Sequence, residues 1–376
     1  MKEILFITTN PNRNNPRSIR ISNIVRNLQE IAPEHNYSVL SFSDKIKTES
    51  LGFLKENMFN LIFLLFRYTG ILQIFKKTSR ISKLLDPFVL VHFLIKWDIK
   101  IRLKKIKDTS KVVFVVVVSP FSNYLFVPWL RKNYPNAVVI LDIGDPLYNN
   151  SARWNDDEVS RSIEFEALNL SNSLLVTNHA TKKHFITLFN INPSGIHIIP
   201  QGVNVELIER KLRNSVTKKK SMVYAGSFYS VLRSPEALFG ALSCQDDYTL
   251  NVFGSNPKMQ FRNVFFHNSL DQEKLFERMA QHDVLVFLDN KTGIQTSGKI
   301  FELVALKKLI LFVKGDGETD TYHWAKGFKN FIFCENNKNS ILQAISEIET
   351  FSYLELNYDS YSFSWRTRAE SYLKLF

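Results

Sequence analysis

The sequence predicts an α/β protein built from two parallel-sheet domains in tandem. Its 376 residues exceed the roughly 100 to 200 residues that one domain usually holds. Short apolar runs rich in β-branched residues alternate with helical patterns, which is typical of parallel sheets covered on both faces. This alternation restarts after the charged stretch 218–220. With 45% hydrophobic and 22% charged residues, the chain can bury ordinary cores, and a mostly disordered state is excluded.

The first half contains the elements of one such domain. Its clearest central strand is the run VVFVVVV at 112–118, which ends at a Ser-Pro turn. Open α/β sheets bind ligands at such carboxyl ends. We also expect strands at 4–8, 38–42 and 137–143, and helices at 18–31 and within 121–133.

The second half repeats the alternation without an internal sequence repeat. The hydrophobic periodicities predict strands at 222–226, 249–253, 263–266, 283–288 and 309–313, and helices at 235–242, 271–281, 297–305 and from 340 onward. The expected domains are therefore 1–205 and 206–358, with a C-terminal helix at 359–376 that packs back on the first domain. We expect the strand-end loops of both domains to line a central cleft.

Positive charge is concentrated in residues 51–110, which hold 12 of the 48 Lys and Arg residues but only 4 of the 36 Asp and Glu residues. Apolar residues recur there at helical spacing in two stripes: Leu61, Leu64, Leu65, Tyr68, Leu72 and Phe75, then Ile81, Leu84, Leu85, Phe88, Val91, Ile95 and Ile99. Basic amphipathic helices with Phe, Leu and a Trp near one end are typical of a membrane interface. We predict peripheral contact with an anionic membrane surface.

Two alternatives to membrane contact remain for this region. The helices are core helices with solvated charged faces, or the basic patch binds nucleic acid. No nucleic-acid-binding motif accompanies the charge, which disfavours the second alternative. A membrane-spanning helix is not expected, because Arg67 interrupts the most apolar stretch, 58–75.

Cysteine content and the N-terminus both indicate a cytoplasmic protein. Cys244 and Cys334 are the only cysteines, which is too few for a disulfide framework or a cysteine-based zinc site. The N-terminal apolar stretch, residues 4–7, is too short for a signal peptide.

The strongest local motif is TSGKIFE at 296–302, at the start of an expected helix. Small residues ahead of a helix leave backbone N–H groups open to an anion, and Lys299 adds a positive charge. Glu302, one turn later, can accept hydrogen bonds from a ribose or sugar diol. Without further context, an ordinary helix start is the better interpretation of the same residues.

Two glycines at strand ends supply that context. Gly226 follows the expected strand 222–225, and Arg233 comes seven residues later, just before a helix. A glycine there permits close approach of a ligand to the backbone, and an arginine can hold a phosphate through two hydrogen bonds. Gly254 ends the next expected strand in the same way.

These motifs together resemble the retaining glycosyltransferases of the GT-B fold, specifically the large family 4. The resemblance covers nearly the whole chain and depends on the order and spacing of several stretches: 166–177, IIPQGVN at 198–204, YAGSF at 224–228 with Arg233, VFG at 252–254, DVLV at 283–286, SGKIFELVA at 297–305 and FSW at 363–365.

The resemblance implies two Rossmann-like domains that face a cleft, of which the second binds a UDP- or GDP-linked sugar. Arg233 and Lys299 would neutralise the diphosphate, and Glu302 would hold the ribose hydroxyls. The implied donor-binding set is Gly226, Ser227, Arg233, Phe253, Gly254, His267, Asn268, Gln295, Thr296, Ser297, Gly298, Lys299 and Glu302. For Phe253 a core position, and for His267 a surface loop position, are the alternatives.

The sequence departs from the family pattern at two places. Where the family commonly has a glutamate that contacts the donor sugar, this chain has Ile294, so Gln295 or backbone groups would meet the sugar instead. The family's N-terminal glycine-rich loop is also absent. We expect Arg17 and Arg20 to take over part of its contact with the donor or acceptor, with plain surface solvation as the alternative.

Asp145 directly follows the expected strand 137–143 and its glycine, which makes it the candidate for positioning the acceptor hydroxyl. A turn-forming role before Pro146 explains it equally well. The sequence contains no Asp-x-Asp motif, so no metal or other cofactor is expected. The cations and helix dipoles would neutralise the leaving group instead.

The resulting functional prediction is a metal-independent, retaining hexosyltransferase. It would act peripherally at the inner face of a bacterial membrane and add a sugar to a lipid-linked glycan during surface polysaccharide synthesis. A nucleotide-sugar 2-epimerase of similar architecture is the first alternative. A non-catalytic, membrane-associated protein that has kept the fold is the second, supported by Ile294.

Overall fold

The computed structural model describes residues 1–8, 16–41, 92–149, 157–228, 233–254, 260–291, 294, 296–351 and 358–376. The chain divides into two compact units. Unit 1 comprises Met1–Pro200 and Arg368–Phe376, and unit 2 comprises Gln201–Thr367. The first predicted amphipathic stripe and the start of the second, within 51–91, lie outside the described residues.

Unit 1 is built on a parallel sheet. Its described strands are β1 (Glu3–Ile7), β2 (Asn36–Leu40), β3 (Val112–Val118), β4 (Val138–Ile143), β5 (Ser173–Val176) and β6 (Ile196–Ile198), in the order β2-β1-β3-β4-β5-β6. Strand β3 pairs with β1 on one side and β4 on the other, and all seven of its residues are buried. Burial on both faces explains why this strand is a continuous run of Val and Phe.

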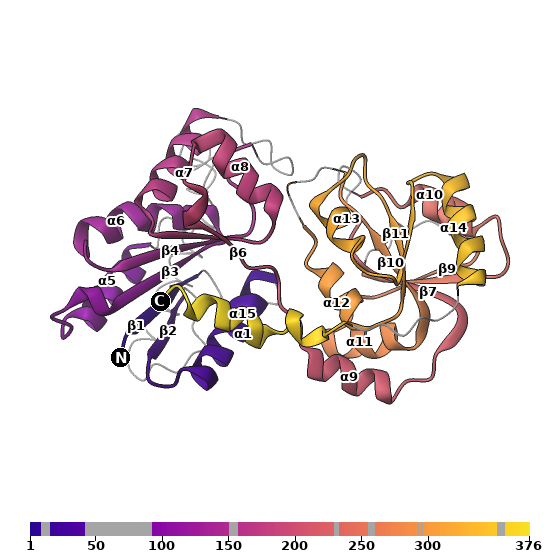
Figure 1. Ribbon diagram of the computed structural model, residues 1–376, viewed down its shortest axis with the longest axis horizontal. Helices are drawn as coiled ribbons and strands as arrows, with labels where there is room; N and C mark the ends of the chain where they lie inside the picture. Colours follow the sequence, from indigo (N-terminus) through magenta and orange to yellow (C-terminus); the bar gives the residue numbers. More distant parts are fainter. Residues whose placement is uncertain are drawn as a thin grey trace, which may run out of the picture. The chain divides into compact units, whose positions relative to one another are not determined.

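Helices cover both faces of this sheet (Figure 1). The described helices are α1 (Pro16–Ile31), α5 (His92–Leu103), α6 (Phe126–Asn133), α7 (Glu158–Leu170), α8 (His179–Phe189) and α15 (Trp365–Leu373). Buried residues of α5, α6, α7 and α8 share one core with Leu5, Phe114 and Leu141 of the sheet. In Figure 1 α15, drawn in yellow, lies beside α1, drawn in indigo, and the Arg20 guanidinium lies 5.5 Å from the ring centroid of Tyr372.

Unit 2 is built on a second parallel sheet. Its described strands are β7 (Lys218–Gly226), β8 (Thr249–Gly254), β9 (Val264–His267), β10 (His282–Leu288), β11 (Leu309–Val313) and β12 (Phe331–Cys334), in the order β12-β11-β10-β7-β8-β9. From β7 the chain runs to β8 and β9 on one side, and it then returns to β10 on the other side. The point where the order reverses therefore lies between β7 and β10.

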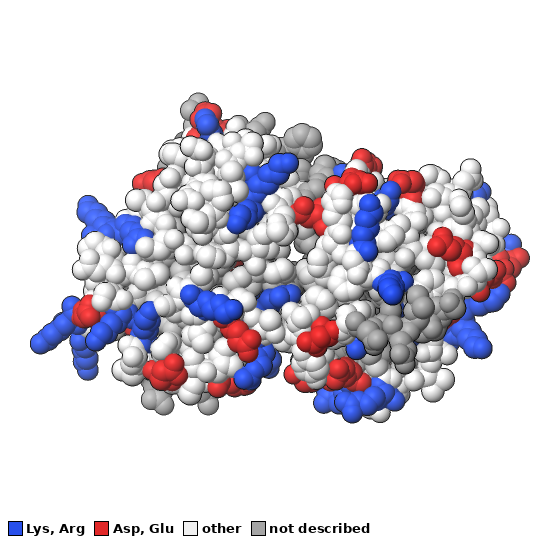
Figure 2. Space-filling model, in the orientation of Figure 1, with Lys and Arg blue, Asp and Glu red and all other residues white. Residues whose placement is uncertain are grey.

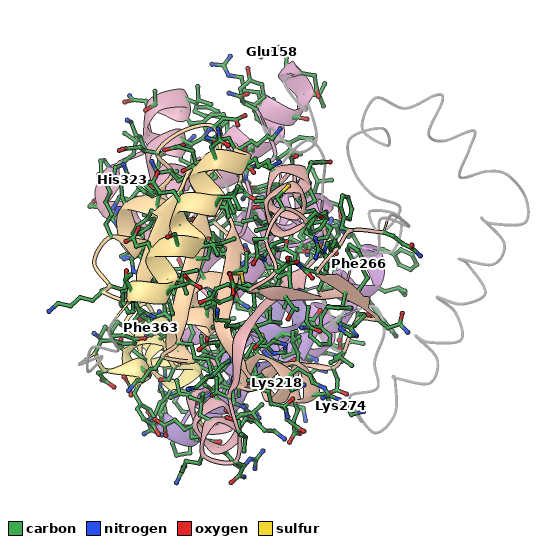
Figure 3. The ribbon with its side chains drawn as sticks, turned by 90° about the vertical axis from the view of Figure 1, so that its right-hand side faces the viewer. Glu158, Lys218, Phe266, Lys274, His323 and Phe363 are labelled. Atoms are coloured by element: carbon green, nitrogen blue, oxygen red, sulfur yellow. The ribbon has the colours of Figure 1, made fainter. Side chains whose placement is uncertain are left out.

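The helices of unit 2 also form two layers. They are α9 (Val205–Arg213), α10 (Glu236–Leu242), α11 (Gln272–Ala280), α12 (Lys299–Ala305), α13 (Asp320–Ala325) and α14 (Lys338–Thr350). Met222 and Tyr224 of β7 belong to the core under α10 and α14, whereas Val223 belongs to the core under α9, α11 and α12. In Figure 3, Lys218 marks the start of β7 and Phe266 lies near the end of β9.

The fold class is as predicted, namely two parallel α/β sheets in tandem. Most expected elements fall within two residues of their observed bounds. Strands β5, β6 and β12 were not expected, because runs of three or four residues carry little periodicity. The predicted helix at 121–133 is a 3₁₀ turn at Phe121–Leu125 followed by α6. Within the part of the chain that the structure describes, each helix is too short or too polar to cross a bilayer.

Candidate functional site

The candidate site lies at the carboxyl edge of the unit 2 sheet, where the strand order reverses. Strand β7 ends at Gly226, and β10 ends at Leu288, which Asp289 and Asn290 follow. Ligands of open α/β sheets bind outside the carboxyl ends of the strands at such a switch point. The fold itself therefore singles out this edge before any side chain is considered.

Arg233 is held at this edge by Asn290. Its Nε donates a hydrogen bond to Asn290 Oδ1 at 2.6 Å. Asn290 is 3% exposed, and a Cβ built on Gly315 would lie 2.0 Å from its carbonyl oxygen. The glycine thus allows two backbone segments to approach closely. Because Nε is occupied, the two terminal nitrogens of the Arg233 guanidinium form the end that can hold an anion in a forked geometry.

Asp289 stabilises this arrangement through hydrogen bonds. It is 5% exposed, it accepts a hydrogen bond from Asn290 N at 2.9 Å, and it accepts another from the hydroxyl of Thr319. Burial raises the pKa of Asp289, an effect that these two hydrogen bonds and the nearby charge of Arg233 oppose. The carboxyl group therefore ties the β10 end to the start of α13, where Thr319 is the N-cap residue.

Lys299 is the first residue of α12 and reaches the same edge. Its Nζ donates a hydrogen bond to Ala225 O at 2.6 Å. A Cβ built on Gly226 would lie 3.3 Å from the same Nζ. Burial lowers the pKa of Lys299; the neighbouring Glu302 opposes this shift and Arg233 adds to it. Arg233 thus lies close enough to lower the pKa of Lys299. Both cations lie at the end of β7, where Gly226 has no side chain.

Glu302 lies one turn after Lys299. Its Oε1 accepts a hydrogen bond from Gln272 Nε2 at 3.0 Å. Burial raises the pKa of Glu302, while Lys299 and the Gln272 hydrogen bond oppose the shift. A half-buried carboxylate with one oxygen already held in place is suited to accept hydrogen bonds from a pair of hydroxyl groups.

These side chains line one pocket in unit 2. Its polar lining consists of Arg233, Ser297, Lys299 and Glu302, and its other lining residues come largely from β7 and β10. The remaining lining residues are Tyr224, Ala225, Met279, Val286, Phe287, Leu288 and Leu303. The structure thus brings together the arginine, the lysine and the glutamate that the sequence analysis singled out.

The start of α12 differs from the prediction. The helix begins at Lys299 rather than Ser297, and its N-cap residue Gly298 makes no side-chain capping bond. Thr296 Oγ1 is buried and has no hydrogen-bond partner among the described residues. A Cβ on Gly298 would lie 2.9 Å from Gln201 Cγ, so the glycine permits close packing. Gln295 lies outside the described residues.

The residues predicted to border a base occur at the ends of β8 and β9. Phe253 is buried, and its ring stacks on that of His267 with 4.7 Å between centroids and 18° between planes. His267 Nε2 is 2.8 Å from Asn251 Oδ1. Asn268 and, at the end of β7, Ser227 are exposed. Phe253 therefore occupies the core position that was its alternative, with one face covered by His267.

Gly254 is the position where glycine is required. Its φ is +127°, and a Cβ there would lie 2.7 Å from Gly226 O. The two strand-end glycines are paired in register across β7 and β8. Close approach of these two strand ends therefore depends on the absence of a side chain at residue 254.

In unit 1 the predicted acceptor residues separate into two environments. Arg20 is fully buried. It donates to Asp142 Oδ2 at 3.2 Å, to Tyr372 Oη at 3.1 Å, and to the backbone oxygens of Ile199 and Pro200 at 2.9 and 2.8 Å. The expectation that Arg20 contacts a substrate is therefore wrong: the guanidinium has no exposed surface, and it acts in holding unit 1 together.

Arg17 and Asp145 are instead accessible and close in the fold. Arg17 donates to Asp142 Oδ1 at 3.2 Å with 17% of its side chain exposed. A Cβ built on Gly144 would overlap the Arg17 guanidinium, so this side chain lies directly over the glycine. Asp145 is the next residue and is exposed at the carboxyl end of β4.

Sequence reasoning missed three residues around these sites. Asn290 and Tyr224 belong to unit 2: the first orients Arg233, and the hydroxyl of the second would lie 3.0 Å from a Cβ on Gly226. Glu164 belongs to unit 1, where it accepts hydrogen bonds from Leu147 N, Tyr148 N and Tyr124 Oη at 2.7 to 2.8 Å. It thereby fixes the loop after Asp145. Two of them had a usable signal: Asn290 comes two residues after the predicted strand 283–288, and Tyr224 is the first residue of the YAGSF motif.

No protein-family model matches the chain, and no curated protein sequence is significantly similar to it. Solved structures do match it over their full lengths. HepE of Anabaena in complex with UDP and glucose has 11% identity and a TM-score of 0.63, with 100% of this chain and 99% of that chain covered. Sucrose-phosphate synthase of Thermosynechococcus elongatus has 13% identity and a TM-score of 0.62, with 99% and 94% covered.

A third match has a different activity in its name. UDP-GlcNAc 2-epimerase of Methanocaldococcus jannaschii, in complex with UDP-GlcNAc and UDP, has 12% identity, a TM-score of 0.53, and 100% and 99% coverage. The chain has the GT-B fold. At these sequence identities, the similarity shows a shared fold and nothing more. Any conclusion about function therefore depends on the pocket of unit 2.

Proposed function

We propose that the chain is a retaining glycosyltransferase similar to family 4, and that unit 2 binds its nucleotide-diphosphate sugar. The acceptor in this proposal is a lipid-linked or membrane-proximal glycan of bacterial surface polysaccharide synthesis. The enzyme would act from the cytoplasm, peripherally at the inner face of the membrane, and would transfer a hexosyl group.

One observation carries the proposal: two cations and a carboxylate share a pocket at the switch point of a nucleotide-fold sheet. Arg233 and Lys299 line it together with Glu302, and Gly226 lies against the lysine. A diphosphate needs positive charge and close backbone approach, and a ribose needs an acceptor for two hydroxyl groups. The complexes of HepE and of the 2-epimerase with UDP support a uridine nucleotide as the first ligand to test, with GDP as the second.

Each side chain has hydrogen-bonding capacity suited to its proposed role. The terminal nitrogens of Arg233 would hold one phosphate in a bidentate manner. Lys299 uses one of its three donors on Ala225 O, so the other two would meet phosphate oxygens. Glu302 Oε2 would accept from the ribose. The nucleotide would in this way lie along the carboxyl ends of β7 and β10.

In the proposed reaction the bond between the anomeric carbon of the sugar and the diphosphate oxygen breaks, and a bond from the acceptor oxygen to that carbon forms on the same face. The acceptor hydroxyl proton passes to the leaving diphosphate. Arg233 and Lys299 stabilise the charge that develops on the diphosphate, in place of a metal ion. Asp145 and Arg17 would position the acceptor, which is a contribution of orientation.

Nucleotide binding is the first test. Titration calorimetry with UDP and GDP should give binding for at least one nucleotide, and Arg233→Ala and Glu302→Ala should each weaken it by about tenfold or more. Lys338→Ala, an exposed basic residue in the same unit, is the matched control and should bind as the wild type does. Wild-type affinity in the double variant Arg233→Ala/Glu302→Ala would refute the proposed site.

Transfer itself is tested with a panel of nucleotide sugars and a membrane extract as the source of acceptor. Glycosylated lipid and released nucleotide should both depend on Arg233 and Glu302. Release of nucleotide that the double variant leaves unchanged would contradict a transferase role.

A 2-epimerase is the second candidate function, because the archaeal UDP-GlcNAc 2-epimerase is also among the structures that the chain matches. An epimer has the same mass as its precursor, whereas transfer or hydrolysis releases a nucleoside diphosphate. Mass spectrometry of the product mixture therefore separates the two reactions. Nucleotide binding without any product would instead favour a non-catalytic protein that has kept the fold.

A further inference from the structure

Helix α5 is anchored in the core of unit 1 by its inner face. Leu94, Ile95, Ile99 and Leu103 are each 5% exposed or less and share the core with the sheet. Ile95, Ile99 and Leu103 follow one another at intervals of four residues and Leu94 lies next to Ile95, so the four side chains form one stripe of the helix. The core alternative considered for the basic region therefore holds for this face of α5.

The outer face of α5 carries a second apolar stripe. Phe93, Trp97 and Ile101 are 53%, 51% and 43% exposed, and they follow one another at intervals of four residues, so they lie on the same side of the helix. Among the described residues, the other large apolar side chains with comparable exposure each come from a different element. A run of three on one helix is thus distinct from ordinary scattered exposure.

Exposed lysines surround this stripe. Lys100 lies beside it on α5, and Lys104, Lys105, Lys107 and Lys111 follow the end of the helix. Residues 92–111 hold seven basic and two acidic side chains, and one of the acids, Asp98, is paired with Arg102 at 3.1 Å. Figure 2 shows blue side chains gathered at the left-hand edge of the molecule, over α5 and the turn after it.

We propose that the outer face of α5 docks on an anionic lipid surface, with Phe93, Trp97 and Ile101 inserted among the headgroups and the lysines on the phosphates. This pattern of apolar side chains, Trp and flanking lysines matches an interfacial helix. It deepens the membrane-proximal role given above by naming the surface, but it does not depend on sugar transfer.

Two other occupants fit these residues less well. A second copy of the chain would bring two basic faces together, and three side chains offer far less than the roughly 800 Å² per partner of a stable interface. Nucleic acid would use the lysines but would leave the apolar stripe in water. A lipid surface satisfies both parts at once.

The test uses sedimentation of the full chain with vesicles and without nucleotide. Vesicles of phosphatidylcholine with phosphatidylglycerol should bind the protein, and pure phosphatidylcholine should bind it at least roughly tenfold less. Two triple variants, Phe93→Ser/Trp97→Ser/Ile101→Ser and Lys100→Glu/Lys104→Glu/Lys105→Glu, should each reduce binding to the mixed vesicles by roughly tenfold or more. Thermal unfolding of both variants should stay close to that of the wild type, which shows that unit 1, the unit that contains α5, is folded.

Matched controls come from unit 2. Val216→Ser/Phe265→Ser removes exposed apolar side chains elsewhere, and Lys219→Glu/Lys329→Glu/Lys338→Glu makes the same change in net charge; all five residues are exposed. Both controls should bind vesicles as the wild type does. Equal losses in the control and α5 lysine variants would show a non-specific charge effect and overturn the proposal.

Two further results would also overturn it. If the apolar variant unfolds at lower temperature but still binds vesicles, other residues of the chain cover the stripe. If it converts a dimer to a monomer in sedimentation velocity, the stripe is an interface between copies. Failure of lipid binding would leave the calorimetric test of the nucleotide site untouched, so the two proposals fail separately.

Discussion

Asn290 Oδ1 accepts a hydrogen bond from Arg233 Nε at 2.6 Å, and this contact fixes which edge of the guanidinium faces the pocket. Arg233 precedes α10, while Asn290 follows β10, 57 residues later. The amide therefore acts as a positioning group for a cation from a different loop. It touches no ligand itself in the proposed mode of binding.

Replacing Asn290 with Ala should weaken UDP binding by about tenfold, because a hydrogen bond to a charged group contributes about 1.5 to 3 kcal/mol. Combined with Arg233→Ala, the variant should cause no additional loss, since residues that act through one another are not additive. Calorimetry on the two single variants and the double variant measures this coupling. Independent, additive losses would show that Asn290 does not act through Arg233.

The sequence was sufficient to place the cations of unit 2 but not those of unit 1. Lys299 and Arg233 follow expected strands, and strand ends meet at one edge of a parallel sheet, so their proximity follows from the fold class. Arg17 and Arg20 carry the same local signal, three residues apart on one helix. Both pair with Asp142, but only Arg20 also contacts Tyr372 and the backbone of residues 199–200, which are far away in the sequence.

The helix start at Lys299 shows a second limit. Thr296, Ser297 and Gly298 have the composition of a capped helix start, but α12 begins only at Lys299, after Gly298, whose own backbone is already in the right-handed helical region. Gly298 is packed against Gln201, a contact that no local pattern encodes. Local composition therefore identified the segment and its charge, whereas tertiary packing set the position of the first turn.

Gly254→Ala should destabilise the protein by about 1 to 3 kcal/mol, because a φ of +127° is strained for a residue with a side chain. The new methyl group would also meet Gly226 O at 2.7 Å. Gly240 lies inside α10, where a Cβ would have no neighbouring atom within 4 Å, so Gly240→Ala is the matched control and should stabilise by about 0.5 to 1 kcal/mol. Urea unfolding measures both, and equal effects of the two changes would refute the argument.

Removing Arg20 should be far more costly than removing a surface cation. Arg20→Ala leaves the fully buried Asp142 carboxylate with fewer partners, and breaking a buried pair costs about 3 to 5 kcal/mol. Lys211→Ala breaks surface pairs with Glu273 and Glu277 and should destabilise the protein much less, because surface ion pairs contribute little. Denaturant unfolding compares them, and a loss below about 1 kcal/mol for Arg20→Ala would rule out its structural role.

Glu164 should make the stability of the protein depend on pH. Burial raises its pKa from 4.5 to about 7, so the folded state binds a proton more tightly than the unfolded state. The stability that the neutral carboxyl group provides is complete below about pH 4.5 and is lost as the pH rises to about 7. By linkage this single group changes the free energy of unfolding by about 3 kcal/mol over that range.

Glu164→Gln removes the titrating group and should flatten the dependence of stability on pH in this range. The variant also loses one hydrogen-bond acceptor, because the amide nitrogen cannot accept a hydrogen bond from Tyr148 N. Its stability relative to the wild type should therefore improve between about pH 5 and about pH 7.5. Glu158→Gln, at an exposed position of the same helix, is the control and should follow the wild-type profile. Urea unfolding at stepped pH gives the difference directly, in which the contributions of groups that titrate independently of Glu164 cancel. A constant difference between the wild type and Glu164→Gln across this range would mean that Glu164 stays ionised in the folded protein.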